Sequence, residues 1–519
     1  MTRTFNLADL FEIVVDAAPD RPALITGEVV YTYAQLDERA TRLSNHLLSL
    51  GINRGDHVGI HAPNCAEWVE AFYACCKISA VAINVNFRYV EAELAYLYSN
   101  SNCALTIVAP EFSDVVGAAA PSLRQLVLDD GYEAALAVAS TGRPTNRRSS
   151  DDLYVLYTGG TTGMPKGVMW RHQDIFFAAL NSSRGNRPLV TPEDLGPEIA
   201  ALPAQMRLLA LGPMMHGGGQ WVMGNALMGG NVFVLWTGKR FDPHAIWRFV
   251  AESGTNSVST IGDAMARPLA EALLEGGRRR PDLSKVRAIG NGGAPLSARV
   301  REQLRQALPN VAIMDSYGAS ETGANGSKLD EGEGLPSPRF QMGEHTTVLR
   351  EDGTQAEAGE VGKLARSGYI PLGYYNDAAK TAATFPTYEA KRWVVPGDFA
   401  RIESDGAITL LGRGSVSINT GGEKVFPEEV EAALKAHPAV FDAVVVGITD
   451  ARWGERVTAI IQLRSDVAEP SDAALGSHCR TLIADYKIPK LVLRVPEVQR
   501  TPVGKADYQW AKITAQMLG

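Results

Sequence analysis

Helical and strand-like hydrophobic patterns alternate along residues 30–110, and this alternation constrains the fold more than any other feature of the sequence. A helical pattern begins at Tyr33, and a second one covers residues 68–76. Residues 57–60 and 80–85 are short apolar runs that are typical of buried strands. Strands joined by helices pair in parallel, because parallel neighbours need a long crossover connection. The sequence therefore predicts an α/β layer with a parallel sheet.

The length of 519 residues suits one large and one small domain. The clearest boundary is Gly412-Arg413-Gly414-Ser415, after which Pro427 is placed to open a helix. A helix over 472–485 and strands over 443–448, 457–463 and 491–495 are expected to follow. We therefore expect an α/β protein with a large domain of several subdomains, with sheets and flanking helices, over 1–412, a hinge at 413–415 and a small α+β domain over 416–519. Residues 131–152 are expected to form a surface connection, and residues 323–340 an ordered loop region.

Charge and composition exclude several classes of protein. A net charge of −8 argues against nucleic acid as the main partner. The five cysteines form no CxxC pattern, so neither a disulfide framework nor a zinc site is expected, which fits the cytoplasm. Acidic residues interrupt the apolar positions near the N-terminus, and no run of 18 apolar residues occurs, so we expect neither a signal peptide nor a transmembrane segment. Peripheral contact with a membrane stays open.

The most informative local motif is the stretch from Tyr157 to Gly167, which follows a strand-like run over residues 153–156. Glycines allow the backbone to approach a ligand, and successive N–H groups can form an anion nest. The candidate phosphate-binding residues are Thr158, Gly159, Gly160, Thr161, Thr162, Gly163 and Lys166. The spacing does not fit the P-loop of classical NTPases. A flexible loop is the alternative, but the density of Gly and Thr before Lys166 favours phosphate binding.

This stretch closely resembles the signature of the adenylate-forming superfamily, which includes acyl-CoA synthetases, firefly luciferase and nonribosomal adenylation domains. Five further segments resemble the other motifs of the family, in the family's order. They are Gly292-Gly293-Ala294-Pro295, Ser316-Tyr317-Gly318-Ala319-Ser320-Glu321-Thr322, Pro396-Gly397-Asp398, Leu411-Gly412-Arg413 and Thr501-Pro502-Val503-Gly504-Lys505. Ser320 stands where the family usually has Thr. The resemblance extends over nearly the whole chain, and six ordered matches are far more specific than any one of them.

The resemblance implies that ATP is a substrate and that these segments bind its adenosine half. The implied nucleotide contacts are Gly292, Gly293, Ala294 and Pro295 on the adenine side, Ser316, Tyr317, Gly318 and Ser320 in the next motif, Asp398 at the ribose, and Arg413 at the ribose or phosphates. Tyr317 offers an aromatic face to adenine, with core packing as the alternative. Asp398 can accept hydrogen bonds from both ribose hydroxyls, with a turn or cap role as the alternative.

The family's chemistry also assigns catalytic roles. The resemblance makes Glu321 and Thr158 the contacts of Mg²⁺, which takes few protein ligands. It makes Lys505 the catalytic lysine, and this cation also contacts the nucleotide. A carboxylate must attack the α-phosphate, so two anions approach each other and a cation stabilises the transition state. A solvated surface charge is the alternative for both Glu321 and Lys505.

Coenzyme A is the acceptor that the resemblance implies for the second step. In the family the mobile small domain rotates between the two steps. The hinge position falls on Ser415, where relatives usually carry Asp or Lys. Gly421, Gly422, Glu423 and Lys424 would approach the pantetheine, with a tight turn before Pro427 as the alternative. A carrier-protein thiol as acceptor, and an inactive nucleotide- or acyl-binding homologue, stay open as competing functions, and a homodimer stays open because relatives are often dimers.

The acyl pocket is expected near His216, Gly217, Gly218 and Trp221. The glycines remove side-chain bulk, and no acidic residue in this stretch is placed to hold an amino group, so a plain hydrophobic acid is favoured. The acid is already ionised at neutral pH, so no general base is needed and His216 is interpreted as a gating or tunnel-lining residue, with a core histidine as the alternative. Further segments resemble bacterial fatty-acid CoA ligases, a subgroup that includes actinobacterial enzymes acting on steroid side-chain carboxylates.

Overall fold

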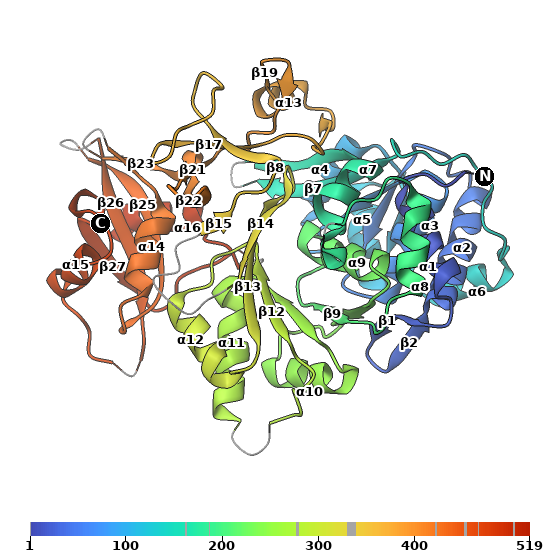
Figure 1. Cartoon of the computed structure of the whole chain (residues 1–519), viewed down its shortest axis with the longest axis horizontal. Coiled ribbons are helices and arrows are strands. Elements are labelled where there is room, and N and C mark those ends of the chain that lie inside the picture. Colours follow the sequence, from blue (N-terminus) through green and yellow to red (C-terminus); the bar gives the residue numbers. More distant parts are fainter. Residues whose placement is uncertain are drawn as a thin grey trace.

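The computed structural model describes residues 2–160, 163–185, 187–276, 280–329, 339–420, 423–450, 454–465, 467–501 and 504–518. It has a large N-terminal domain and a small C-terminal domain, which lies at one end of the molecule (Figure 1). Within the described residues, none of the helices combines the length and the apolar character needed to cross a bilayer.

The predicted parallel α/β layer is confirmed as a seven-stranded sheet in the order β18-β8-β7-β4-β3-β5-β6. Its strands are β3 (His57–His61), β4 (Val81–Asn84), β5 (Cys103–Val108), β6 (Arg124–Val127), β7 (Leu153–Gly160), β8 (Gly163–Arg171) and β18 (Gly373–Tyr374). The helices between them are α3 (Ala66–Lys77), α4 (Glu91–Ser101), α5 (Ser113–Ala119) and α6 (Asp130–Val138). Strands β3 to β7 pair in parallel, whereas β8 and β18 pair antiparallel.

A second sheet has eight strands in the order β14-β13-β12-β11-β9-β10-β1-β2. Its strands are β1 (Pro22–Thr26), β2 (Val29–Thr32), β9 (Arg207–Ala210), β10 (Val232–Leu235), β11 (Ser257–Thr260), β12 (Ala288–Gly292), β13 (Ala312–Ala319) and β14 (Gly323–Leu329). The helices between these strands in the chain include α8 (Leu195–Ala200), α9 (Gly217–Met228), α10 (Pro243–Ser253), α11 (Gly262–Glu275) and α12 (Ala298–Ala307), whereas α7 (His172–Ile175) contacts β7 and β8 of the first sheet. Helix α3 packs on the first sheet and α9 on the second, and α1 (Leu7–Ala17) contacts both helices. The largest core therefore lies between the two sheets.

A third, antiparallel sheet leads to the small domain. It consists of β15 (Arg339–Gln341), β16 (Thr346–Leu349), β17 (Val361–Arg366), β21 (Asp398–Ile402) and β22 (Ala407–Arg413), with α13 (Ala378–Thr384), β19 (Thr387–Tyr388) and β20 (Lys391–Arg392) nearby in the chain. The small domain contains β23 (Ile418–Thr420), β24 (Glu423–Val425), α14 (Pro427–Lys435), β25 (Val440–Asp450), β26 (Gly454–Leu463), α15 (Asp472–Arg480), β27 (Leu491–Val495) and α16 (Tyr508–Leu518). Pro427 opens a helix and residues 491–495 form a strand, as the sequence predicts.

Two segments differ from the sequence prediction. Residues 131–152 are expected to be a surface connection, but most of α6 lies in them, and the side chain of Arg148 beyond it is only 8% exposed. Residues 323–340 were expected to be a loop region, but β14 fills their first seven positions. Pairing with β13 satisfies the backbone of β14, so its glycines do not prevent a strand.

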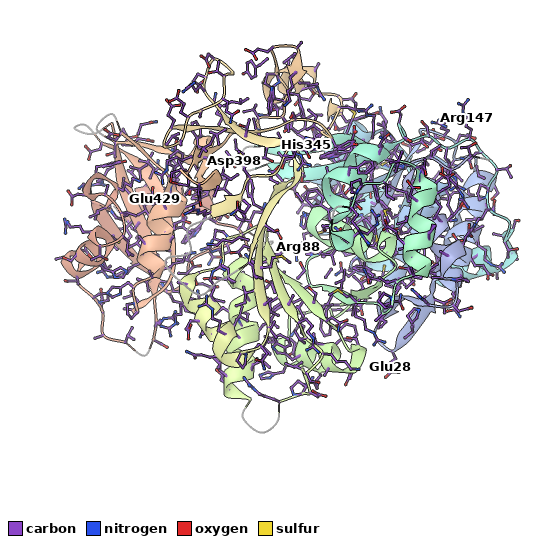
Figure 2. The ribbon with its side chains drawn as sticks, in the orientation of Figure 1. Glu28, Arg88, Arg147, His345, Asp398 and Glu429 are labelled. Atoms are coloured by element: carbon purple, nitrogen blue, oxygen red, sulfur yellow. The ribbon has the colours of Figure 1, made fainter. Side chains whose placement is uncertain are left out.

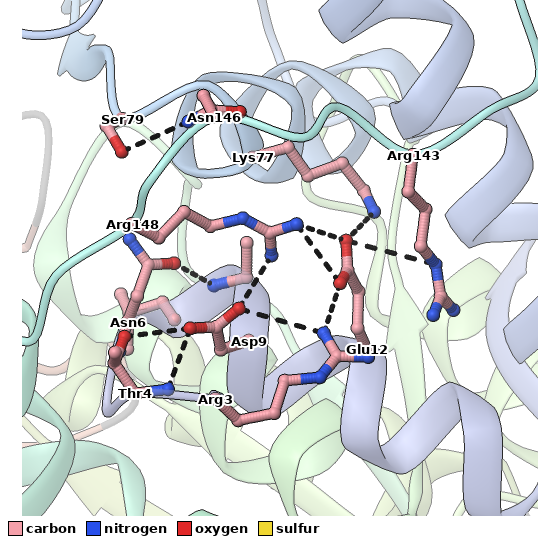
Figure 3. Close-up of polar contacts among 12 residues, drawn as sticks. Arg3, Thr4, Asn6, Asp9, Glu12, Lys77, Ser79, Arg143, Asn146 and Arg148 are labelled. Carbon is pink, nitrogen blue, oxygen red and sulfur yellow. Dashed lines mark hydrogen bonds and ion pairs between the residues drawn. The ribbon is translucent and has the colours of Figure 1, made fainter. Parts of the chain in front are cut away.

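A buried ionic cluster explains why Arg148 turns inward (Figure 3). The Lys77 Nζ of α3 lies 2.7 Å from the Glu12 carboxylate of α1 and 2.6 Å from Asp37 of α2 (Tyr33–Ser49). Arg148 lies 3.0 Å from both Glu12 and Asp9. Burial alone would raise the pKa of Glu12, but the positive charges of Lys77 and Arg148 lower it to about 2. The cluster thus holds helices α1, α2 and α3 and the segment that follows α6 together.

Replacing Lys77 by Met removes the fully buried cation that pairs with both Glu12 and Asp37, although Arg143 still contacts both carboxylates. The Lys77 side chain is 0% exposed and that of Glu12 is 1% exposed, so water cannot take its place. We expect Lys77→Met to lower the free energy of unfolding by about 3–5 kcal/mol in urea denaturation followed by circular dichroism. The matched control is Lys363→Met, which removes an exposed pair with Glu351 and should cost about 1 kcal/mol or less. Equal losses in the two variants would contradict a structural role for the cluster.

Candidate active site

The glycine- and threonine-rich stretch belongs to a β-hairpin of β7 and β8, whereas a flexible loop is the alternative that the sequence leaves open. Strand β7 continues to Gly160 and β8 begins at Gly163, with Thr158 directly opposite Lys166. The Lys166 Nζ donates to the Asp377 carboxylate at 2.7 Å. Thr161 and Thr162 lie outside the described residues, so their predicted contacts stay predictions. The structure therefore places Thr158 and Lys166 opposite each other on the two strands of a hairpin.

Asn84 at the end of β4 joins this hairpin to the predicted acyl pocket. Its Nδ2 donates to the carbonyl oxygens of Tyr157, at 2.8 Å, and Met215, at 2.6 Å, and its Oδ1 accepts from the Tyr157 N–H at 2.7 Å. Asn84 is buried, so these bonds are shielded from water. They hold Tyr157, which precedes Thr158, close to Met215, which precedes His216.

Strand β8 also fixes the segment that contains Glu321. The indole N–H of Trp170 donates to the Ser320 carbonyl oxygen at 3.0 Å. The Tyr374 hydroxyl donates to the Glu321 carboxylate at 2.9 Å, and the Lys166 Nζ lies 5.8 Å from the centre of the Tyr374 ring. The predicted phosphate and metal residues are thus linked through Tyr374, which the sequence interpretation missed.

The two motifs predicted on the adenine side meet at the ends of neighbouring parallel strands. Gly292, the last residue of β12, pairs with Ser316 of β13. Gly293 has a φ of +76° and begins the loop that continues to Ala294 and Pro295. A Cβ on Gly318 would collide with the carbonyl oxygen of Gly323, so this position requires glycine. Loops at the carboxyl ends of parallel strands are the usual place for a ligand in such sheets.

Tyr317 and Asp398 connect the second sheet to the third. The Tyr317 hydroxyl donates to the Asp398 carboxylate at 2.9 Å. Asp398 is buried at the start of β21, directly opposite Arg413 of β22, and lies beside the small domain in Figure 2. The hydrogen bond gives the carboxylate a fixed orientation, and a carboxylate has two oxygens that can each accept more than one hydrogen bond.

Lys505 lies on a turn of the small domain that contacts α11 of the large domain. Its backbone closes a tight turn in which Thr501 N–H donates to the Lys505 carbonyl oxygen at 2.9 Å and Lys505 N–H donates to the Thr501 hydroxyl at 3.1 Å. A Cβ on Gly504 would lie 2.8 Å from Ala264 of α11, so the turn lies against the large domain.

His216 lies within electrostatic reach of Lys505. Burial lowers the pKa of His216 to about 4, and the nearby charges of Lys505 and Arg88 act in the same direction. Arg88 lies near the centre of the molecule in Figure 2. At neutral pH the imidazole is therefore uncharged, and its buried Nε2 has no hydrogen-bond partner within the described part of the chain. This atom can therefore pair with a ligand.

The glycines after His216 differ in their surroundings. A Cβ on Gly217 would lie 2.8 Å from Leu156 and 3.4 Å from the ring of Trp221, whereas a Cβ on Gly218 would have no atom within 4 Å. Open space therefore adjoins Gly218, while Gly217 and Trp221 pack together.

The residues predicted for the hinge and for coenzyme A are only partly described. Gly421 and Gly422 lie outside the described residues, and Glu423 is exposed in β24. The backbone places Lys424 in β24, Arg413 at the end of β22 and Ser415 in a short 3-10 turn. Their predicted roles stay predictions.

Comparison with known proteins supplies the class. The model of the AMP-binding enzyme family matches residues 11–375, and that of the AMP-binding enzyme C-terminal domain matches residues 429–505. The chain belongs to this family of enzymes, as the motif resemblance predicts.

Curated relatives cover almost the whole chain. One is a 3-oxocholest-4-en-26-oate–CoA ligase of Rhodococcus rhodochrous, 46% identical over 98% of this chain and 95% of the relative. Another is a medium/long-chain-fatty-acid–CoA/3-oxocholest-4-en-26-oate–CoA ligase of Mycobacterium tuberculosis, strain H37Rv, 43% identical over 99% of this chain and 96% of the relative. An ATP-bound RpMatB-BxBclM chimera is similar in structure, with a TM-score of 0.84 and 25% identity over 98% of this chain and 99% of the chimera.

Replacing Tyr317 by Phe removes the hydroxyl that orients Asp398 and keeps the ring. A hydrogen bond to a charged group contributes about 1.5–3 kcal/mol, so we expect the Kd for ATP to rise at least tenfold in calorimetric titration. Tyr486→Phe, which changes a tyrosine of the small domain that is 40% exposed, is the control and should bind ATP like the wild type. An unchanged Kd in Tyr317→Phe would contradict the role given to this hydrogen bond.

Proposed function

We propose that this protein is an ATP-dependent acyl-CoA ligase that activates a hydrophobic carboxylic acid. The acid forms an acyl-adenylate with release of pyrophosphate, and coenzyme A then takes the acyl group with release of AMP. Membership of the AMP-binding enzyme family and CoA ligases as relatives support this function. The observation that carries it is the Lys505 turn, which the small domain brings against α11 and within electrostatic reach of His216.

In the first step, an oxygen of the carboxylate attacks the α-phosphorus of ATP and the bond to pyrophosphate breaks. Lys505 is the cation that stabilises the charge gathered on the α-phosphate in the transition state. The acid is already ionised, so no proton needs to be removed. This suits a neutral His216 that lines the acyl site instead of acting as a base.

The remaining proposed nucleotide contacts lie at or near the ends of strands. The proposed phosphate contacts are Thr158, Gly159, Gly160, Thr161, Thr162, Gly163 and Lys166, and the adenosine contacts are Gly292, Gly293, Ala294, Pro295, Ser316, Tyr317, Gly318, Ser320, Asp398 and Arg413. Asp398, held by Tyr317, is placed to accept from the ribose hydroxyls. Lys166 would exchange its ion pair with Asp377 for a phosphate, because the Lys166 side chain is 38% exposed and a ligand can reach it.

Mg²⁺ fits the oxygens of Glu321 and Thr158. Within the described residues no three His, Cys, Asp or Glu side chains gather into a metal site, so a cation here would take most of its ligands from phosphates and waters, as Mg²⁺ does. One oxygen of Glu321 already accepts from Tyr374, which orients the carboxylate. When bound, Mg²⁺ would neutralise charge on the leaving pyrophosphate.

In the second step the thiol of coenzyme A, as its thiolate, attacks the acyl carbonyl carbon and AMP leaves with the oxygen that came from the acid. We assign 1–412 to the large domain, 413–415 to the hinge and 416–519 to the small domain, which turns about Ser415 between the steps. Gly421, Gly422, Glu423 and Lys424 would then approach the pantetheine. Gly414 beside the hinge supplies backbone freedom.

The acid is a medium- or long-chain fatty acid or a steroid side-chain carboxylate. The names of the two curated relatives give such acids as their substrates. In this chain the predicted acyl site has open space at Gly218, and Trp221 packs on the neighbouring Gly217. We expect the protein to act in the cytoplasm, with contact to a membrane surface or a second copy of the chain as additional features to be tested.

Lys505→Ala tests the adenylation step. Removing a cation at the reacting phosphate typically costs roughly 10²–10³ in rate, so carboxylate-dependent ATP–pyrophosphate exchange should fall by that factor. Lys512→Ala, on the helix that follows, is the control and should keep wild-type exchange. Failure of the wild type to exchange pyrophosphate with any acid would refute the enzyme function.

A panel of acids tests the substrate class. We expect thioester formation with free coenzyme A to be fastest with medium- or long-chain and steroid side-chain acids, because burial of each methylene in an apolar pocket contributes about 0.8 kcal/mol. Acetate and benzoate are the controls for small acids. Turnover of these two with none of the larger acids would contradict the proposal, and adenylation without transfer to free coenzyme A would favour a carrier-protein thiol as acceptor.

A further inference from the structure

We propose that Phe441 of the small domain is a positioning residue for adenylate formation, because its ring docks on Arg267 of the large domain and thereby places the Lys505 turn. This inference rests on the proposed function and names a residue pair that sets the domain arrangement of its first step.

The contact between the domains that carries this inference is a cation lying over an aromatic ring. The guanidinium carbon of Arg267 lies 4.2 Å from the centre of the Phe441 ring. Arg267 is buried on α11, where its Nη2 donates to the Asp263 carboxylate at 2.8 Å. Its buried Nη1 has no hydrogen-bond acceptor among the residues that the structure describes. The ring face of Phe441 is therefore a major partner of this buried charge, which makes the contact sensitive to the position of the small domain.

Phe441 is connected to Lys505 through its neighbour in the sequence. Asp442 accepts from Arg500, with the Nε donor at 2.8 Å and the Nη2 donor at 2.5 Å. Arg500 directly precedes the turn from Thr501 to Lys505, and a single bridge pairs it with Ala506 on the other side of that turn. The contact of Phe441 with α11 thus helps to position the turn, because the bidentate Asp442–Arg500 ion pair and a short piece of backbone connect the two.

A second contact with the large domain supports the same docking. The Nη1 of Arg299, on α12, donates to the Pro438 carbonyl oxygen at 3.5 Å. Figure 1 shows α11 and α12 next to the small domain. This long hydrogen bond is weak, whereas the ring contact sets a buried charge of the large domain directly against the small domain. Because the small domain turns before the second step, the ring contact serves adenylation and has to open for transfer to coenzyme A.

Phe441→Leu keeps an apolar side chain and removes the aromatic face. Loss of a desolvated cation–π contact should lower the kcat of ATP–pyrophosphate exchange roughly tenfold, with little change in the KM for ATP. The second half-reaction, measured as thioester formation from purified acyl-adenylate and coenzyme A, should keep its wild-type rate. Phe441→Tyr should restore exchange, because it returns an aromatic face to Arg267.

Arg464→Ala is the matched control. Arg464 lies 5.4 Å from the centre of the same ring and donates to the Pro438 carbonyl oxygen at 3.1 Å, but it belongs to the small domain itself. Its removal leaves the contact of Arg267 with the Phe441 ring in place and should leave exchange within about twofold of the wild type. Wild-type exchange in Phe441→Leu, or an equal fall of both half-reactions, would overturn the inference. A wild-type protein that catalyses neither half-reaction would instead refute the proposed function, and this inference with it.

Discussion

The antiparallel pairing of β7 with β8 is the interaction on which the candidate site depends. It sets Thr158 opposite Lys166, and β8 extends from there to Trp170, whose indole holds the Ser320 carbonyl oxygen. The other edge of β8 pairs with β18, which presents the Tyr374 hydroxyl to Glu321. Segments more than 200 residues apart in the sequence, such as Lys166 and Asp377, thereby meet at one strand pair. The residues predicted to contact phosphate and metal are thus held by the backbone pairing of β7, β8 and β18.

The cation that we propose for the adenylation step, Lys505, belongs to a different domain. The large domain supplies the strand-end loops, Glu321 and Asp398, but Lys505 arrives on a turn of the small domain that rests on α11. This division suits a reaction with two steps, because a lysine needed for attack on phosphorus need not occupy the same place when a thiol attacks the acyl carbon. Two of the contacts between the domains, Phe441 on Arg267 and Pro438 with Arg299, are of a kind that can open.

Hydrophobic periodicity predicted the parallel α/β layer, and Pro427 predicted the start of α14, because both signals are local. The motifs identified the strand ends that meet in the structure, although the roles of their residues stay predictions. Tyr374 and Trp170 were missed, since hydrogen bonds to a distant carboxylate or carbonyl leave no sequence pattern. Lys77 and Arg148 were missed for another reason: charged residues are expected on the surface, and their burial depends on carboxylates from other helices.

The central claim is that the acid forms a mixed anhydride with AMP before it reaches coenzyme A. The most direct measurement is mass spectrometry of the AMP released during turnover of a fatty acid whose carboxylate carries ¹⁸O. Attack of the carboxylate on the α-phosphorus transfers one carboxylate oxygen to phosphorus, so AMP should gain one ¹⁸O atom for each thioester formed. Unlabelled AMP formed together with thioester, or label found in inorganic phosphate with ADP as the nucleotide product, would contradict it.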